Sequence, residues 1–419
     1  MLDLKELRED PHGIECRLRT KDPEISLAPL LKLDDRARHL IQSVEALKAK
    51  RNDLSKKVGE LKREGKDATE VLQAVSSFGD EITALDHELN LISQELSKGL
   101  LSLPNIPMEG IKSSLNPADN ICIKTYGEKR EFDFTPKNHV ELNQTLGYFD
   151  FERGAKVAGT GWPVYKGDGA RLEWALLNYM IDIHRKNGFT QIIPPHLVRP
   201  EIMQGSGQLP KFETQLFKLK DDDYHLYLIP TSEVALCGLH YDEIIDDAAL
   251  PIKYVSYTPC FRREGGAAGS KERGLIRVHQ FNKVEMFAFT RPEESEEMFE
   301  LMLKSAEEIL QGLGLHYRNM LLVTGDMSFA AAKTVDIEAY LPGQNRYYEV
   351  SSVSNCTDFQ SRRSQIRCKA PGGKTRLVHT LNGSGLATSR LMVALLENNQ
   401  NKDGTVSLPS VLNRYLSIP

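Results

Sequence analysis

The sequence predicts an α+β fold in two parts: an N-terminal antiparallel α-helical coiled-coil hairpin, and a domain with a largely antiparallel β-sheet flanked by helices. Apolar residues that recur at alternating spacings of three and four between residues 30 and 96 predict the hairpin. Short strand-like runs that follow one another without regular intervening helices predict the sheet, and they argue against a doubly wound parallel fold. We place the boundary near residue 110, which gives domains of residues 1–110 and 111–419.

Two long helices form the predicted hairpin. The first apolar series runs through residues 30–61 and the second through residues 71–96, with a polar turn over residues 63–69 between them. We expect Thr69 to cap the second helix. Each apolar stripe is too narrow for a helix inside a globular core, so the two helices should pair with each other. At about 1.5 Å per residue, each would be on the order of 45 Å long.

The end of the predicted hairpin is basic. Residues 48–66 hold eight Lys and Arg residues against three Asp and Glu residues. Two interpretations are equally open on charge alone: the charges are solvated flanks of a coiled coil, or they contact nucleic-acid phosphates without reading bases. The whole chain has a formal net charge of −5, so it is not a uniformly basic nucleic-acid-binding protein, and any polyanion contact has to use a local patch.

The composition is that of an ordinary soluble protein with two or three domains. At 419 residues and 40% hydrophobic, the chain can bury more than one core. The N-terminal segment lacks the apolar stretch of a signal peptide, and no apolar run has the length of a membrane span. The six cysteines are scattered, without a CxxC pair or a zinc-like spacing. We therefore expect reduced thiols in a cytoplasmic protein.

The elements after the hairpin follow from periodicity and from turn residues. Two prolines in residues 103–107 end the hairpin, because neither can continue a helix. Residues 171–187 have helical spacing and stop at Gly188, as is typical of a helix C-terminus. A strand over residues 191–193 follows. Further strands are predicted at residues 224–229, 253–257, 275–289, 315–323, 334–341, 347–352 and 376–379.

A predicted β-hairpin over residues 260–289 carries an unusual number of charges. Its two strands are joined by a loop of small residues, 265–269. Alternation places four charged residues and one aromatic ring on one sheet surface: Arg262 and Glu264 on the first strand, and Arg277, Phe281 and Glu285 on the second. A solvated face with ion pairs is the plain interpretation. Two polar segments further along the chain favour a site instead.

These downstream segments supply a candidate metal site and a candidate anion site. Glu349 and Ser351 lie on one face of a predicted strand, with Ser352 at its end. They offer hard oxygen ligands of the kind that Mg²⁺ uses, although a lone glutamate on a strand is more often structural. Residues 382–390 predict a glycine-lined turn leading into a helix over 391–396, with Arg390 in its first turn. A cation there is unfavourable unless an anion such as phosphate binds beside it. The chemistry indicated is positioning and charge stabilisation around a nucleotide phosphate.

Taken together, these segments resemble the class II aminoacyl-tRNA synthetases. Residues 171–195 resemble motif 1 of that class, residues 261–264 with the strand through Phe281 resemble motif 2, and the turn ending in Arg390 resembles motif 3. Within the class, the chain is similar to the bacterial type of the seryl-tRNA synthetase family. That similarity rests on the helical hairpin and on three strings: GSGQLPKF at 205–212, TSE at 231–233 and TLNGSG at 380–385. Departures are Ser232, where the family more often has alanine, and Arg414, where proline is common.

The resemblance implies a ligase that activates L-serine with ATP and Mg²⁺ to seryl-adenylate and transfers the seryl group to tRNA(Ser), and also to tRNA(Sec) in organisms that have one. It implies three catalytic residues: Arg262, Glu285 and Arg390. It implies a serine-binding set: Thr231, Ser232, Glu233, Arg262, Glu285, Asn382 and Ser384. It implies an ATP-binding set: Arg262, Arg263, Glu264, Arg277, Val278, Phe281, Glu349, Val350, Ser351, Ser352 and Arg390. The implied Mg²⁺ ligands are Glu349 and Ser352.

The resemblance also implies partners. The hairpin would reach the long variable arm of the tRNA, the 265–269 loop of motif 2 would lie over ATP and the acceptor end, and a homodimer would bind tRNA across both subunits. Two alternatives differ in class. A ligase that charges a carrier protein would lack the hairpin, and a non-catalytic tRNA-binding paralogue would lack the site residues that are present here: Arg262, Glu285, Glu349 and Arg390.

Overall fold

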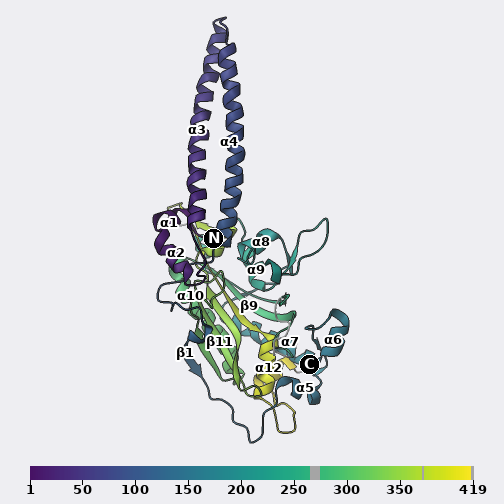
Figure 1. The fold of residues 1–419 in the computed structure, drawn as a ribbon. Coiled ribbons are helices and arrows are strands. Elements are labelled where there is room, and N and C mark those ends of the chain that lie inside the picture. Colours follow the sequence, from purple (N-terminus) through teal and green to yellow (C-terminus); the bar gives the residue numbers. More distant parts are fainter. Residues whose placement is uncertain (265–273, 370–371, 417–419) are drawn as a thin grey trace. The chain divides into compact units, whose positions relative to one another are not determined.

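The computed structural model describes residues 1–264, 274–369 and 372–416. The chain divides into two compact units, one made of residues 2–19 and 23–103, the other of residues 1, 20–22 and 104–419. We call them the hairpin unit and the sheet unit (Figure 1). The assignment of tRNA binding to residues 1–110 and of aminoacylation to residues 111–419 stays a prediction.

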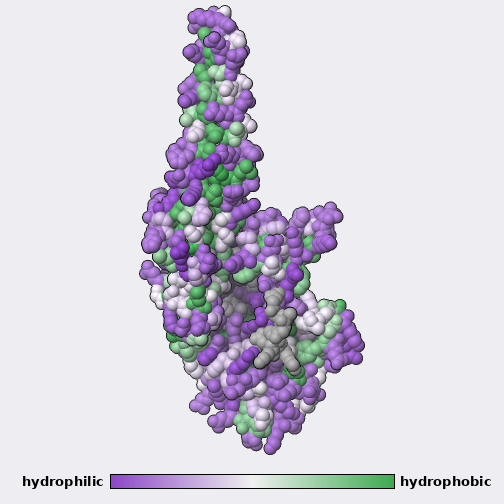
Figure 2. All heavy atoms as spheres, viewed as in Figure 1, coloured by the Kyte–Doolittle hydropathy of each residue, from purple (hydrophilic) through white to green (hydrophobic). Residues whose placement is uncertain are grey.

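The hairpin unit confirms the predicted pair of long helices. After two short helices, α1 (Leu4–Glu9) and α2 (Pro11–Arg19), the chain forms α3 (Ala28–Arg63) and α4 (Thr69–Ser102), which run side by side along their length (Figure 1). Apolar side chains gather in a narrow band along the seam, between hydrophilic flanks (Figure 2). The capping role predicted for Thr69 is wrong. Thr69 is the first helical residue, and its backbone N–H donates to Asp67 Oδ1 at 2.9 Å.

The sheet unit is built on eight strands in the order β1-β10-β11-β12-β15-β9-β8-β4. All neighbours pair antiparallel except β4 and β8, which confirms the predicted sheet type. The strands are β1 (Ile121–Tyr126), β10 (Tyr317–Leu321), β11 (Lys333–Leu341), β12 (Arg346–Asn355), β15 (His379–Ala387), β9 (Gln280–Thr290), β8 (Ile252–Phe261) and β4 (Thr190–Gln191). Smaller sheets pair β2 (Phe149–Asp150) with β3 (Val164–Tyr165), β5 (Leu197–Val198) with β6 (Tyr227–Leu228), and β7 (Ile244–Asp246) with β13 (Arg367–Lys369) and β14 (Thr375–Leu377).

The helices of the sheet unit bury one face of this sheet, and they also cover part of the opposite face. The helices are α5 (His139–Leu146), α6 (Phe151–Ala158), α7 (Asp168–Lys186), α8 (Pro200–Gly205), α9 (Ser232–Gly238), α10 (Ser295–Gly312), α11 (Phe359–Ser364), α12 (Thr388–Asn398) and α13 (Asn413–Leu416). On β9, the even positions Val284, Met286 and Ala288 join the main core with residues of α7, α10 and α12. Because side chains alternate along a strand, the odd positions of β9 face the other way. On that face Phe287 and Phe289 join a second buried cluster with α9, while Phe281, Lys283 and Glu285 line the site.

Helix α7 confirms the helix predicted over residues 171–187, and it ends before Gly188, whose φ of +86° is the left-handed conformation of a helix C-terminus. Two other predictions on local structure were wrong. Residues 275–279 precede β9 rather than forming its first half, and residues 382–387 belong to β15 instead of a turn. Gly385 is needed there for close packing, because a Cβ atom at this position would lie 2.1 Å from His184 Nε2. The loop predicted at 265–269 lies outside the described residues.

None of the described helices is long and apolar enough to cross a membrane. All six cysteines are free thiols, four of them buried. The predicted reduced state agrees with this arrangement.

Candidate active site

Two adjoining polar cavities lie on the open face of the sheet beside β9, β12 and β15. The outer cavity has a volume of about 160 Å³ and the inner cavity about 470 Å³. Both are lined by six shared residues: Arg262, Glu264, Arg277, Lys283, Glu349 and Ser384. The two cavities are therefore halves of one site.

Arg262 lies at the junction of the two halves. It follows the last residue of β8, so it is not on the strand as predicted, but its backbone N–H donates to His279 O at 2.9 Å and holds it beside the start of β9. Its Nε donates to Pro230 O at 3.2 Å, and its guanidinium lies 5.2 Å from the ring centre of Phe281. These contacts hold the Arg262 side chain in place, and it still lines both cavities.

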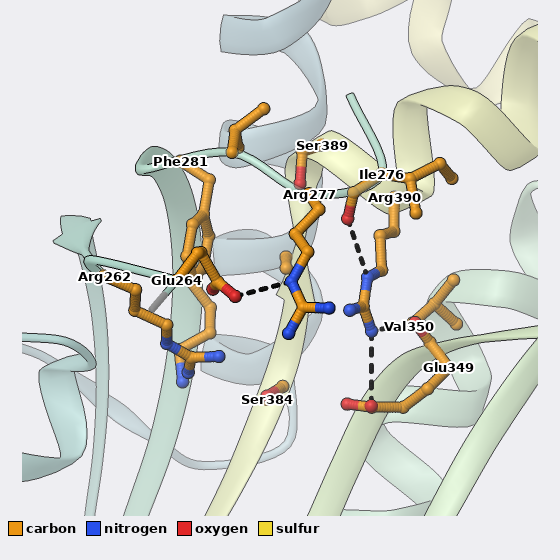
Figure 3. Close-up of a pocket in the computed structure, with 13 residues that line it drawn as sticks. Arg262, Glu264, Ile276, Arg277, Phe281, Glu349, Val350, Ser384, Ser389 and Arg390 are labelled. Atoms are coloured by element: carbon orange, nitrogen blue, oxygen red, sulfur yellow. Dashed lines mark hydrogen bonds and ion pairs between the residues drawn. The ribbon is translucent and has the colours of Figure 1, made fainter. Parts of the chain in front are cut away.

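The outer cavity concentrates guanidinium groups. Arg277 Nε donates to Glu264 Oε2 at 2.7 Å, and Arg390 Nη1 lies 3.2 Å from Glu349 Oε2. The guanidinium groups of Arg277 and Arg390 face the same space (Figure 3). Arg277 reaches this wall from the segment before β9, and Arg390 from the first turn of α12, as predicted. Three arginines around one small cavity suit a polyphosphate, because each guanidinium can bind phosphate oxygens with two hydrogen bonds.

The inner cavity contains a buried ion pair that sequence reasoning missed. Lys283 Nζ donates to Thr231 Oγ1 at 2.7 Å and forms an ion pair with Glu285. Both side chains of the pair are less than 10% exposed. The signal was in the sequence, because Lys283 shares the odd face of β9 with Phe281 and Glu285. Across the sheet, the register places Ser384 of β15 directly beside Glu285.

A second acid, Glu233 at the start of α9, is held in the inner cavity by amide groups. Gln360 Nε2 and Asn382 Nδ2 donate to its Oε1 at 2.7 and 3.1 Å. Burial, and then the negative charge of Glu285, raise the pKa of Glu233 to about 7. An acid that is half ionised near neutral pH is ready to bind a ligand ammonium, which would stabilise its charged form.

The structure brings most predicted side chains to the cavities but not all of them. Val278 and Val350 line the outer cavity, and Thr231, Ser352 and Asn382 line the inner one. Three predicted residues line neither cavity: Ser232, Arg263 and Ser351. The hydroxyl of Ser232 is buried against Thr258 Oγ1 at 2.6 Å, and that of Ser351 donates to Ser384 O at 2.6 Å. These hydroxyl groups hold strands and helices together, away from the ligand space.

Polar side chains on β11 and β12 lie where the sequence predicts a metal site. Glu349 and Ser352 line the inner cavity from β12, and Asp336 of β11 lies opposite Ser352 in the strand register. Burial, and then the charge of Glu349, raise the pKa of Asp336 well above its usual value, while a hydrogen bond from Ser352 opposes this rise. Sequence reasoning missed Asp336. A carboxylate and a hydroxyl beside a group of arginines that suits a polyphosphate fit Mg²⁺, which uses few protein ligands and completes its shell with water and phosphate oxygens.

Comparisons with known proteins agree along the whole chain. The family described as "Seryl-tRNA synthetase N-terminal domain" matches residues 1–107, and "tRNA synthetase class II core domain (G, H, P, S and T)" matches residues 217–399. A serine-tRNA ligase of Chlamydia abortus is 52% identical, covering 99% of this chain and 98% of the relative. That of Chlamydia muridarum is 48% identical, covering 100% and 97%.

Solved structures agree as well. The seryl-tRNA synthetase of Pyrococcus horikoshii complexed with ATP has a TM-score of 0.93 at 37% identity, covering 99% of this chain and 98% of that one. The cytoplasmic enzyme of Naegleria fowleri in complex with AMP has a TM-score of 0.88 at 30% identity, covering 99% and 97%. With matches of this extent in sequence and in fold, the chain belongs to the seryl-tRNA synthetase family of class II aminoacyl-tRNA synthetases.

Proposed function

We propose that the outer cavity holds ATP, the inner cavity holds serine, and Arg262 bridges the two substrates. As a member of its family, the chain activates serine with ATP and transfers the seryl group to tRNA. The observation that carries the site assignment is the position of Arg262, which lines both cavities between the arginines on one side and the buried acids on the other. A single guanidinium there can bind the serine carboxylate and the α-phosphate together, bringing nucleophile and electrophile into contact.

The remaining side chains of the outer cavity would orient ATP. Phe281 stacks on the adenine ring, Glu264 accepts from the adenine amino group, and the backbone at Val278 contacts the base. Arg277 and Arg390 hold the outer phosphates of a bent ATP. In the free site these two arginines already pair with Glu264 and Glu349, so ATP binding exchanges internal ion pairs for contacts with substrate.

The inner cavity would orient serine for attack. Thr231 and Glu233 receive the ammonium group, while Glu285, Asn382 and Ser384 meet the ammonium or the hydroxyl. A serine carboxylate oxygen then attacks the α-phosphorus in line, and pyrophosphate leaves with the bonding electron pair. In the second step a terminal ribose hydroxyl of tRNA attacks the seryl carbonyl, and AMP leaves. Alanine is a poor substrate in this account, because it leaves buried polar groups of the site without a partner.

The pH dependence of serine binding follows from Glu233. Below about pH 7 this carboxyl is mostly neutral, and only the ionised form pairs with an ammonium group. The apparent KM for serine should therefore rise as pH falls from 8 to 6, by up to about tenfold per pH unit below the pKa. Steady-state pyrophosphate exchange across that range measures it. Glu233→Gln should raise the KM and make it independent of pH over the same range. A flat wild-type profile would exclude this role for Glu233.

We further propose that Glu349 and Ser352 bind Mg²⁺ with the ATP phosphates. When bound, the ion would neutralise negative charge on the phosphates and on the departing pyrophosphate. Glu349→Gln should raise the Mg²⁺ concentration for half-maximal exchange about tenfold or more. The matched control is Glu338→Gln. Glu338 lies opposite Glu349 in the β11–β12 register, pairs with Arg318 and lines neither cavity. An equal shift in both variants would contradict the assignment.

The proposal extends to macromolecular partners. The helices of the hairpin unit would contact the variable arm of tRNA through backbone and shape, and two copies of the chain would form a homodimer that binds tRNA across both subunits. The predicted contact of the 265–269 loop with the acceptor end lies outside the described residues. Two assays in sequence test the whole proposal: serine-dependent ATP-pyrophosphate exchange, and then charging of tRNA. Exchange without charging would favour a ligase for another acceptor, and no exchange would contradict the site.

A further inference from the structure

Lys283 occupies the place that the proposed function gives to the substrate ammonium. Its own ammonium contacts Thr231 Oγ1 at 2.7 Å and Glu285, and both of these residues are proposed to receive serine. The side chain is 7% exposed, and a lysine is tolerated at such depth only when its charge is paired. In the free site, Lys283 therefore supplies the positive charge that the buried acids would otherwise lack.

Lys283 lies on β9 between the residues proposed for the adenine side and the serine side of the site. The odd positions of the strand share one face, in the order Phe281, Lys283 and Glu285. If Phe281 stacks on adenine and Glu285 binds serine, the bond between the serine carboxylate and the α-phosphorus forms between these two residues. Lys283 is the residue of this face that lies there. Lys283 also lines both cavities, so it can reach the phosphate side as well as the serine side.

A lysine suits two positions better than an arginine does. Its charge is compact and sits on a flexible stem of four carbons, so it can change partners without moving the strand. Two ammonium groups cannot both pair closely with Glu285 and Thr231 in this buried space. Serine binding consequently forces the lysine ammonium to leave. The other cavity that Lys283 lines contains two carboxylates, Glu264 and Glu349, and receives the negatively charged ATP phosphates in the proposed function.

We propose that Lys283 is a further catalytic residue. In the free site, its ammonium occupies the position that the ammonium of serine takes on binding. Serine displaces it toward the α-phosphate, where it stabilises the negative charge that develops during attack. Binding of serine then delivers a cation to the reacting phosphorus, which couples occupation of the inner cavity to chemistry at the outer one. This inference rests on the proposed function of the two cavities.

The test uses Lys283→Met in the full chain, which keeps the length of the side chain and removes its charge. The expected result is a Kd for serine, measured by calorimetry without ATP, that is no weaker than that of the wild type, because the internal competitor is gone. The single-turnover rate of adenylate formation should fall about 100-fold. An unchanged rate would overturn the proposal. A Kd for serine that rises more than tenfold, with an unchanged rate, would also overturn it. That result would show that Lys283 only positions Glu285.

The matched control is Lys124→Met. In the wild type, Lys124 Nζ lies 2.7 Å from Oε2 of another buried carboxylate, Glu307, and this pair lies outside both cavities. The variant removes that ammonium and should leave exchange unchanged. Wild-type exchange separates the two hypotheses: a wild type without serine-dependent exchange contradicts the proposed function, whereas an active wild type with an equally fast Lys283→Met variant contradicts only the present inference.

A second measurement applies even if the variant does not fold. A crystal structure of the wild-type chain with seryl-sulfamoyl-adenosine, an unreactive analogue of seryl-adenylate, should show Lys283 Nζ within hydrogen-bond distance of a sulfamoyl oxygen. A lysine still bound to Thr231 and Glu285 in that complex would overturn the proposal.

Discussion

Replacing Arg262 with alanine is expected to reduce serine-dependent pyrophosphate exchange by about 1,000-fold or more. The expectation follows from the position of this side chain at the wall of both cavities. In the proposed function, one guanidinium there binds the attacking carboxylate and the attacked phosphate together. Its loss removes both the orientation of the reactants and a positive charge at the reacting centre. Few other single changes in the site should cost as much.

Steady-state exchange at saturating ATP and serine measures this effect, and Arg262→Lys tests its cause. Lysine keeps the charge but loses the two-point contact, so it should recover only part of the rate. Arg318→Ala is the matched control. Arg318 pairs with Glu338 at 2.6 Å and lies over the ring of Tyr347, away from both cavities. An Arg262→Ala variant within tenfold of the wild type would show that the substrates do not meet at this residue.

Deletion of residues 36–94 should have a large effect on a different step. The expected result is normal serine-dependent exchange together with a loss of tRNA charging of at least about 100-fold in kcat/KM. The apolar side chains of this segment form a cluster of their own, which is separate from the main cluster of the sheet unit, so exchange is expected to survive their removal. The basic end at residues 48–66, which is proposed to contact tRNA phosphates, is lost with them.

The deletion can be made without breaking the base of the hairpin. A Cβ atom on Gly99 would lie 2.5 Å from Leu30 Cδ1, so α3 and α4 touch at that level, and residues 35 and 95 follow a few positions further along. A short glycine-serine linker should therefore join the two cut ends. Charging that survives the deletion would refute the role proposed for the hairpin, whereas loss of exchange would show that the two units depend on each other.

Much of the fold could be predicted because its signals are local. The three-and-four spacing that runs through residues 30–61 and 71–96 identifies a coiled coil, since no other structure buries so narrow a stripe over such a length. The prediction over 382–387 was wrong for a nonlocal reason. Glycines in sequence suggest a turn, but Gly385 lies in β15 because His184 of α7 leaves no room for a side chain. That contact joins residues 201 positions apart, so a local pattern could not reveal it.

The candidate site was predicted unevenly for similar reasons. Arg277 and Glu264 come together in the outer cavity, as predicted, but neither lies on a strand. Glu264 has a φ of +46°, which is not a strand conformation. The alternation of strand side chains, on which the prediction relied, therefore does not explain why they meet. Lys283 was left out of the predicted face, although the alternation that placed Phe281 and Glu285 there places Lys283 between them. Asp336 could not be found from spacing, because it reaches Ser352 only through the pairing of β11 with β12.

The most direct test of the central claim is ATP-pyrophosphate exchange by the full chain with serine, alanine or threonine as the only amino acid. The claim is that one continuous site selects serine in its inner half and activates it against ATP in its outer half. The account predicts exchange that depends on serine, with kcat/KM at least about 100-fold lower for the other two amino acids. Exchange of equal rate with alanine, or exchange without any amino acid, would contradict it.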